Sequence, residues 1–305
     1  MKKHYNIMTS CDGNLLRQVE ILMYSIDKSL AGADVDFYLF HRGLDGDDIA
    51  GLYGFSSLLT NLRFHDVVVK DIDKYDYIAS YGGGWAGEAY YSLCAHEYLP
   101  QDVDRVMYLD AGDLIVVGDI DDFYSADFED NVILASNIRL YIDGQPVIFE
   151  SEDELSDENK MLQILDSTFN SGSYMLNLDK LRRAGLTIDD YVSFTNMFLP
   201  LADVMPQIYF GDQGFLSACF LGDIKYYGYP KEPNLITTAF NFTMGWYNIF
   251  DHEPDFEPAV IHYAGAAKPW QVKSLSELKP RQVKWYELWI QYSKHVEGMR
   301  CSLSI

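Results

Sequence analysis

The sequence predicts an α/β domain in which helices cover a mostly parallel sheet. Two observations favour this class. Apolar segments of strand length alternate with helical ones near the start of the chain, and no linker rich in Pro, Gly or Ser divides its 305 residues. Because ligands bind outside the carboxyl ends of the strands in such sheets, polar residues that follow the predicted strands are candidates for a functional site.

The first part of the chain has strand and helix signals in alternation. We expect strands at 4–11, 35–40 and 62–69, with helices at 15–30 and 45–59 between them. The first helix is supported by apolar residues at helical spacing: Val19, Leu22, Met23 and Ile26. This βαβαβ order predicts parallel strands, since parallel neighbours need a crossover connection that is usually a helix.

The later elements are spaced more widely. A helix at 88–99 is expected to stop before Pro100, and residues 105–109 form a buried strand. Further strands are expected at 131–136 and 173–178. The polar, acidic stretch 141–168 between them is the candidate for a mobile lid or a surface insertion.

Composition excludes two classes of protein. The chain holds 23 Lys and Arg against 46 Asp and Glu, a formal net charge of −23, so its average surface does not suit nucleic acid. With 48% hydrophobic and 15% aromatic residues, it is not a disordered polyelectrolyte. Most of the acidic charge is expected to serve solubility, although some can hold a divalent metal.

The cysteines and the termini favour a cytoplasmic protein. Four cysteines lie far apart without a CxxC pair, so neither a zinc cage nor a small disulfide framework is expected. The first apolar segment is too short for a signal peptide. No stretch approaches the roughly 18 uncharged residues of a membrane-spanning helix.

The end of the chain differs in charge from the rest. Residues 268–305 hold seven basic side chains against three acidic ones. They also hold five aromatic residues: Trp270, Trp285, Tyr286, Trp289 and Tyr292. One interpretation is a helix packed on the domain with its lysines in water. The other is a patch that rests on the anionic inner face of a membrane.

Glycines at 82–84 and 87 do not form a recognised phosphate loop. The string lacks the GK[ST] ending of a P-loop and the GxGxxG spacing of a dinucleotide-binding helix. We expect a flexible turn before the 88–99 helix.

Two carboxylates follow the strand at 105–109. Asp110 and Asp113 repel each other unless a cation lies between them, so they predict a metal site. An ordinary acidic turn is the alternative. A phosphatase of the DxDxT type is not indicated, because Leu and Ile follow Asp113 where that motif needs a Thr.

Three further segments carry polar residues at predicted element ends. His262 ends an apolar strand, Gly265 allows close backbone approach, and Lys268 can neutralise an anion. Asp212 and Gln213 begin an amphipathic helix, in which Asp212 could be only an N-terminal cap. Residues 170–172 form a polar turn that leads into a strand.

Together these segments resemble glycosyltransferase family 8, the retaining nucleotide-sugar transferases that include bacterial lipopolysaccharide galactosyl- and glucosyltransferases and glycogenin. The matching motifs occur in family order and span nearly the whole chain. They are Ser10-Cys-Asp12-Gly-Asn14, Asp110-Ala-Gly-Asp113 with Gly118-Asp-Ile120, Asn170-Ser-Gly172, Asp212-Gln213, and His262-Tyr-Ala-Gly265 with Lys268-Pro-Trp270.

The resemblance implies a GT-A fold, in which a Rossmann-like, nucleotide-binding mixed sheet merges with a smaller acceptor-side sheet. It places the catalytic domain at 1–267 and makes 268–305 a basic, aromatic, helical extension packed on it. Acceptor choice is expected to reside in 141–168 and 228–257.

The resemblance also implies roles for single residues. Metal ligands would be Asp110, Asp113 and His262; their carboxylate and imidazole donors favour Mn²⁺ over Mg²⁺. The donor would be bound by Ser10, Asp12, Asn14, Asp110, Ser171, Gly172, Gly265 and Lys268. Catalytic residues would be Gln213, Asp212 and Asn170.

Two departures from the family pattern stand out. The second acid of the family's DxD motif is displaced by one residue, with Gly112 in its place, and a bulge there would turn Asp113 back towards the metal. Where family members commonly place a cation after a Tyr, this chain has Ser92. These departures motivate the alternative of a catalytically inactive nucleotide-sugar-binding or scaffold protein.

The expected activity is transfer of galactose or glucose from a UDP-sugar to a glycan or lipid-linked acceptor, in cell-surface polysaccharide or lipopolysaccharide synthesis. Retention of configuration allows a double displacement or a front-face transfer. Gln213 is a poor nucleophile, so we favour the front-face route.

Overall fold

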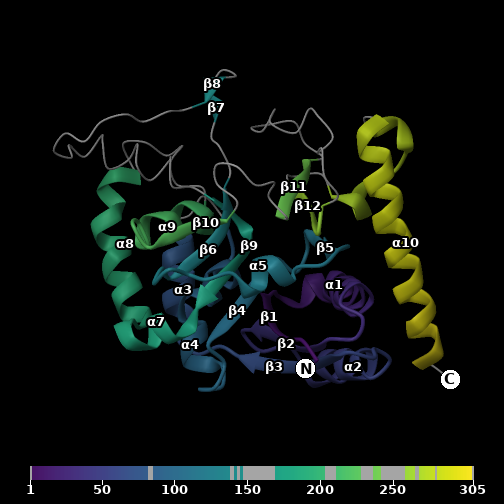
Figure 1. Ribbon diagram of the computed structural model, residues 1–305, viewed down its shortest axis with the longest axis horizontal. Coiled ribbons are helices and arrows are strands. Elements are labelled where there is room, and N and C mark those ends of the chain that lie inside the picture. Colours follow the sequence, from purple (N-terminus) through teal and green to yellow (C-terminus); the bar gives the residue numbers. More distant parts are fainter. Residues whose placement is uncertain are drawn as a thin grey trace.

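The structure is an α/β fold with helices on both faces of a central sheet (Figure 1). The computed structural model describes residues 2–81, 85–137, 141–142, 145–146, 169–202, 211–227, 236–241, 258–264, 268–278 and 280–303. The predicted fold class is confirmed.

Within the described residues, the central sheet has seven strands and is mixed. In spatial order they are β10 (Ile224–Tyr227), β6 (Ile133–Asn137), β9 (Phe169–Asn177), β4 (Arg105–Leu109), β1 (His4–Ser10), β2 (Asp34–His41) and β3 (Leu62–Val68). The β1, β2, β3 and β4 pairings are parallel, whereas β9 runs antiparallel to both of its neighbours. Because β9 runs against β4, its early residues lie beside the carboxyl end of β4.

A second, three-stranded sheet lies next to this edge. Its order is β11 (Ile236–Asn241), β12 (Val260–Ala264) and β5 (Leu114–Val116). Strand β12 is antiparallel to β5, with His262 opposite Leu114. Two short strands, β7 (Tyr141–Ile142) and β8 (Gln145–Pro146), pair separately.

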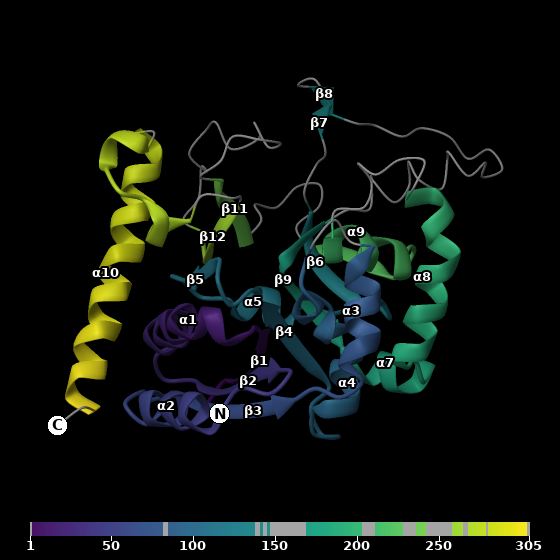
Figure 2. The same ribbon diagram turned by 180° about the vertical axis from the view of Figure 1, so that it is seen from behind.

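Helices fill both faces of the central sheet. The α-helices are α1 (Leu16–Ser29), α2 (Gly46–Ser56), α3 (Ile72–Ser80), α4 (Ala95–Tyr98), α5 (Asp121–Ser125), α7 (Leu178–Ala184), α8 (Ile188–Ala202), α9 (Gly211–Cys219) and α10 (Pro280–Leu303). The 3₁₀ helices are η1 (Gly13–Leu15), η2 (Gly87–Cys94), η5 (Pro269–Gln271) and η6 (Leu275–Glu277). In both ribbon views, α8 and α10 lie on opposite flanks (Figures 1 and 2).

Side-chain alternation along the strands builds two hydrophobic cores. On β1, Ile7 enters the core shared with α1, α2, the second sheet and α10, while Met8 enters the core shared with α3, η2, α7 and α8. Both side chains are fully buried. The sheet is therefore covered on both faces, as parallel strands require.

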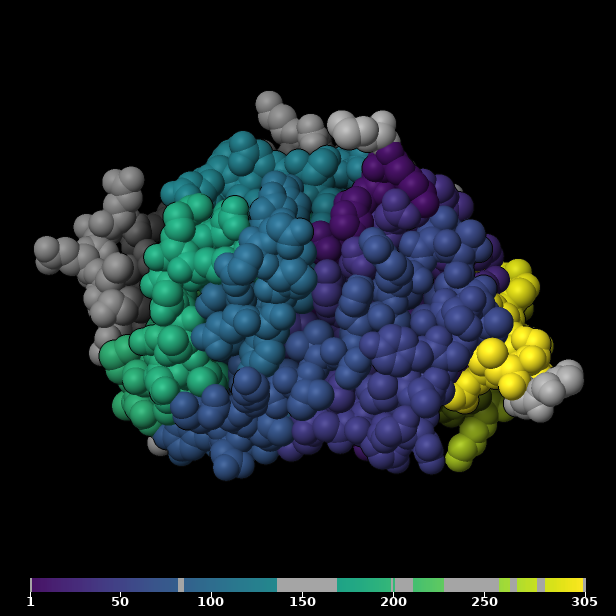
Figure 3. Space-filling view, turned by 90° about the horizontal axis from the view of Figure 1, so that it is seen from below, coloured from purple at the N-terminus to yellow at the C-terminus, as the bar shows by residue number. Residues whose placement is uncertain are grey.

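The C-terminal helix packs on the domain. Trp285, Trp289, Tyr292 and Val296 are buried in the core that includes α1 and β12. Seen from below, the last turns of α10 lie at the rim beside α2 (Figure 3). Three of the aromatic residues on which the membrane interpretation depended are thus in the core, so that part of the interpretation is wrong. Across the described ranges, none of the helices combines the length and apolarity needed to cross a bilayer.

Three local predictions were wrong. The segment expected to be a helix at 88–99 is mostly the 3₁₀ helix η2, followed by the single-turn α4; Pro100 holds Leu99 extended. Residues 170–172, expected to form a turn, belong to β9. Helix α9 begins at Gly211 with nearly every side chain buried, and Asp212 lies in its first turn, so Asp212 is not the N-terminal cap. Packing on several sides overrides local preference in these segments.

Several predictions fall outside the described residues. These are the glycines at 82–84, most of the expected lid at 141–168, most of the 228–257 segment, and Gly265. The domain boundary between 267 and 268 also stays a prediction.

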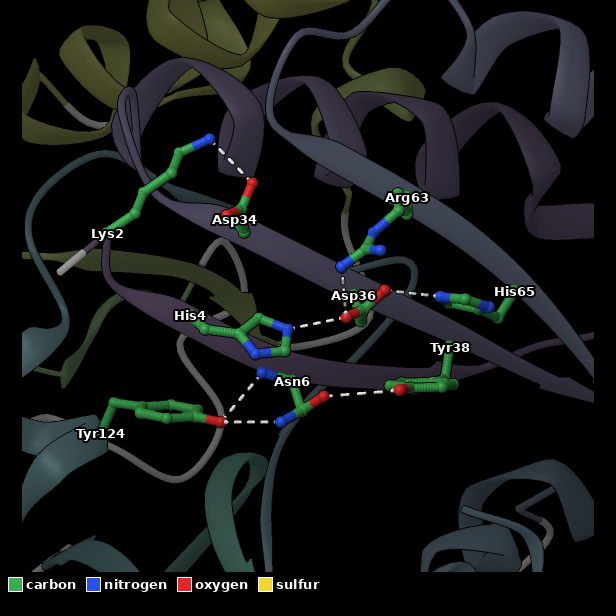
Figure 4. A network of polar contacts seen from close by, with 9 residues as sticks. All are labelled: Lys2, His4, Asn6, Asp34, Asp36, Tyr38, Arg63, His65 and Tyr124. Atoms are coloured by element: carbon green, nitrogen blue, oxygen red, sulfur yellow. Dashed lines mark hydrogen bonds and ion pairs between the residues drawn. The ribbon is translucent and has the colours of Figure 1, made fainter. Parts of the chain in front are cut away.

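A polar network lies on one face of β1, β2 and β3, in the first halves of these strands (Figure 4). Asp36 on β2 is buried between His4, Arg63 and His65, with distances of 2.6 Å to His4 Nε2, 2.7 Å to His65 Nε2 and 3.0 Å to Arg63 Nη2. Burial by itself would raise the pKa of Asp36, but these hydrogen bonds and the Arg63 charge lower it below the usual value.

Replacing Asp36 with asparagine is expected to lower the free energy of unfolding by about 1–2 kcal/mol at pH 7. A lowered pKa stabilises the fold above the unfolded-state pKa, and this contribution is lost as pH falls below about 4. The difference between wild type and Asp36→Asn should therefore shrink between pH 5 and pH 3 in denaturant titrations. Asp34→Asn is the matched control: Asp34 pairs with Lys2 in solvent, where ion pairs contribute little. A pH-independent difference would contradict the assignment.

Candidate functional site

Two acids and a histidine from three segments meet beyond the carboxyl end of β4. Asp110 follows β4, Asp113 precedes β5 and His262 lies on β12. One potential ligand atom from each lies within 4.8 Å of the others. His262 Nε2 is 3.8 Å from Asp113 Oδ2. The turn at 111–113, which contains Gly112, brings the displaced acid back to the cluster.

Backbone hydrogen bonds hold the segments that carry these residues together. The Tyr263 amide donates to the Asp113 carbonyl at 2.7 Å, and the Asp110 amide donates to the Gly172 carbonyl at 2.9 Å. Gly172 also faces the imidazole, because a Cβ placed there would lie 2.6 Å from His262 Cε1. A glycine is therefore needed where β9 passes the histidine.

Asp110 is the most perturbed acid of the cluster. Burial, with the nearby charges of Asp212 and Asp113, raises its pKa to about 7, against the opposing effects of His262 and Tyr108. The Tyr108 hydroxyl donates to Asp110 Oδ1 at 2.9 Å and lies 3.2 Å from Ser10 Oγ. Such a carboxyl is poised to exchange a proton for a metal ion.

The pKa of Asp113 is shifted in the opposite direction, because this carboxylate is paired with basic side chains. Burial would raise its pKa, but His262 and Lys268 lower it below the usual value. Lys268 Nζ forms an ion pair with Asp113 and donates to the Tyr263 carbonyl at 3.2 Å. Lys268 thus lies directly beside the candidate metal ligands.

Asp212 extends the acidic group from α9. Its side chain is buried, and burial raises its pKa to about 6, although a hydrogen bond from Ser171 opposes the shift. Gln213 is buried next to it. The Asn170 side-chain carbonyl accepts from the Gly172 amide at 3.0 Å, so Asn170 helps to shape the β9 backbone.

The cluster fits a divalent ion by its donor set. Two carboxylates and an imidazole suit Mn²⁺, and the excess of buried negative charge needs a cation. The other imidazole nitrogen, His262 Nδ1, is buried and has no hydrogen-bond partner among the described residues. No group in the described part of the chain therefore bonds to Nδ1 in a way that would force the imidazole proton onto Nε2. This leaves Nε2 available to bind a metal.

Comparison with known proteins decides the family. The family model described as glycosyl transferase family 8 matches residues 6–274. The chain belongs to glycosyltransferase family 8. Its match covers every segment of the site described above.

Two curated relatives of this family 8 chain are similar at low identity. A lipopolysaccharide 1,2-glucosyltransferase of Escherichia coli is 26% identical over 192 residues, covering 61% of this chain and 50% of the relative. The glycosyltransferase GlyF of Streptococcus pneumoniae is 25% identical over 277 residues, covering 85% of this chain and 57% of the relative. The chain thus spans about half the length of the curated relatives that it matches.

Solved structures show the GT-A fold. The galactosyltransferase LgtC, crystallised with donor and acceptor sugar analogues, has a TM-score of 0.64 at 22% identity, with 95% of both chains covered. GlyE of Streptococcus pneumoniae has a TM-score of 0.56 at 18% identity, covering 99% of this chain and 64% of that chain. The predicted fold family is therefore confirmed.

The expected nucleotide-side residues lie at the end of β1. Asp12 accepts from the Asn14 amide at 2.9 Å and from Asn14 Nδ2 at 2.8 Å, which caps η1 and orients both side chains. Ser10 is buried and reaches the Tyr108 hydroxyl.

The position where the family pattern places a cation belongs to the core of this protein. Ser92 is fully buried and accepts from the Tyr174 hydroxyl at 2.6 Å. Tyr174 stacks on Tyr108, with ring centroids 5.1 Å apart. This tyrosine pair beneath the acids was not predicted. The available signal was the spacing of Tyr108 two residues before Asp110 on an extended chain.

Proposed function

We propose that this family 8 chain is a metal-dependent, retaining glycosyltransferase. It would transfer galactose or glucose from a UDP-sugar to a glycan or lipid-linked acceptor, in the cytoplasm, during cell-surface polysaccharide or lipopolysaccharide synthesis. The observation that supports the proposal most is the convergence of Asp110, Asp113 and His262 beside Lys268.

Each group has a chemical task in this proposal. Asp110, Asp113 and His262 would hold Mn²⁺ or Mg²⁺, and a bound ion supplies positive charge that stabilises the departing diphosphate. Lys268 binds the diphosphate, whereas Ser10, Asp12 and Asn14 bind the nucleoside. Gly265 is expected to add a backbone contact.

The sugar lies on the Asp212 side in this proposal. Asp212, Ser171 and Asn170 would orient its hydroxyls, with Gln213 near the anomeric carbon and Gly172 leaving room for His262. An amide is a weak nucleophile, so the acceptor would attack on the face from which the diphosphate leaves. The leaving phosphate would take the acceptor proton.

Metal and diphosphate binding are expected to be coupled through Lys268. Its ammonium forms an ion pair with Asp113, a proposed metal ligand. In this proposal the ammonium leaves Asp113 when the diphosphate offers it another anion. Lys268→Met should tighten Mn²⁺ binding without nucleotide about tenfold and weaken UDP binding by a similar factor. Calorimetry of both ligands measures this, with the exposed Lys273→Met as control. An unchanged Mn²⁺ affinity in Lys268→Met would contradict this coupling.

A panel of nucleotide sugars tests the activity. Purified protein with Mn²⁺ should release nucleoside diphosphate from UDP-galactose or UDP-glucose, slowly with water and faster with a suitable acceptor. No release and no binding with any donor would overturn the proposal.

A second candidate function is a nucleotide-sugar-binding scaffold without catalysis. The buried, neutral Ser92 favours it, because a donor-side cation of the family pattern is missing. Binding of a UDP-sugar without turnover, across all acceptors tried, would support this alternative.

A further inference from the structure

The exposed indole of Trp85 contacts the residue that precedes Asp212. Trp85 is 58% exposed, whereas Trp285 and Trp289 are 4% and 6% exposed, so it is the most exposed tryptophan in the described ranges. An indole combines a large apolar ring with a polar N–H, and tryptophan is enriched where proteins bind ligands or partners.

Trp85 is held by a glycine that makes room for it. A Cβ on Gly211 would lie 2.1 Å from Trp85 Cδ1 and 2.2 Å from Nε1, so the five-membered part of the indole contacts the bare backbone. Gly211 also has φ +59°, a conformation that other residues rarely adopt. One edge of the ring is therefore fixed, and much of the remainder faces solvent.

Gly211 also connects this ring to the charged groups of the candidate site. Lys268 pairs with Asp113, and Asp113 lies 3.8 Å from His262. The Asp110 amide donates to the Gly172 carbonyl, and the neighbouring Ser171 is hydrogen-bonded to Asp212. Gly211 directly precedes Asp212 in the chain, so the indole lies on the Asp212 side of these groups.

We infer that Trp85 is the stacking platform for the acceptor sugar. This inference rests on the proposed function, in which the diphosphate lies at Lys268 and the donor hexose at the buried Asp212. The acceptor must then arrive from solvent beyond Asp212, where the ring is exposed. A hexose presents one face of C–H groups that packs on an indole, while its hydroxyls stay hydrated. Trp85 would bind and orient the acceptor without taking part in bond breaking.

Steady-state kinetics separate acceptor binding from donor binding. The probes are lactose, methyl β-galactoside and methyl β-glucoside, with the UDP-sugar that the protein turns over. Trp85→Ala should raise the acceptor KM about tenfold while the donor KM changes less than twofold. Trp85→Phe, which keeps an aromatic face, should raise the acceptor KM less. Tyr53→Ala removes another exposed ring, on α2, and should change neither constant.

A donor KM raised as much as the acceptor KM would place the ring over the donor instead and overturn the inference. Unchanged acceptor KM in Trp85→Ala would also overturn it. Circular dichroism of each variant excludes unfolding as the cause.

A binding measurement keeps this inference separate from the proposed activity. Adding the same glycosides to wild type should change the tryptophan fluorescence, and Trp85→Phe should lose that change. If the protein turns over no donor but shows this Trp85-dependent change, the activity proposal fails and the platform stands. If donors are turned over but the fluorescence response is the same in both proteins, or absent from wild type, only the platform fails.

Discussion

Asp110→Asn is expected to lower metal-dependent release of UDP from the donor by at least about a hundredfold. The substitution keeps the shape of the side chain but removes the charge that lies between His262, Asp113 and Asp212. Asparagine can still accept from the Tyr108 hydroxyl, so the fold should survive. Initial rates of UDP release, with Mn²⁺ varied, measure the effect.

The pH dependence of metal binding gives an independent readout. Because the metal-free Asp110 has a pKa of about 7, protons compete with the metal below that pH. In calorimetry with UDP present, wild type should bind Mn²⁺ more tightly as pH rises from 6 to 8, and Asp110→Asn should lose most of this dependence. Asp119→Asn, an exposed acid beyond β5, is the matched control. Wild-type rate and Mn²⁺ affinity in Asp110→Asn would reject the site.

Gly172→Ala is expected to have the second largest effect. The added methyl would lie 2.6 Å from His262 Cε1 and 2.9 Å from Asn170 Oδ1, so the imidazole must leave its present position beside the two acids. Metal affinity should fall about ten- to a hundredfold, as it does when the groups that position a ligand are disturbed. Overpacking should also lower the free energy of unfolding by about 1–3 kcal/mol.

The control for this substitution is Gly51→Ala. Gly51 lies within α2, and a Cβ there meets no atom within 4 Å. Alanine should leave metal affinity unchanged and stabilise the helix by about 0.5–1 kcal/mol. Metal titrations and denaturant unfolding of both variants provide the comparison. Equal Mn²⁺ affinity in Gly172→Ala and Gly51→Ala would show that His262 is not a ligand.

The parts of the fold that could be predicted carry local signals. Strands β1, β2, β3 and β4 and helices α1 and α2 were expected from periodicity, and their bounds agree within a few residues. Helices α3, α7 and α8 were not expected. The η2 segment was mistaken for an α-helix because almost all of its side chains are buried by neighbouring elements, which the chain itself does not reveal.

The aromatic residues of the segment 268–305 show the same limit of prediction from the sequence. From the sequence, Trp285 and Trp289 next to lysines favoured a packed helix but also allowed a membrane surface. Only the position of α10 against α1 and β12 decides that these rings are in the core.

The sequence by itself determined the α/β class, the order of the motifs and the residue types at the candidate site, because side-chain periodicity and turn chemistry are properties of neighbouring residues. The family resemblance implied that Asp110, Asp113 and His262 share a metal, and the tertiary structure places them together. Only the tertiary structure decided that Lys268 pairs with Asp113 and that Trp85 rests on Gly211. Those contacts join segments far apart in the chain. The meeting of the two acids and the histidine depends on the antiparallel course of β9 beside β4 and on the register of β12 on β5.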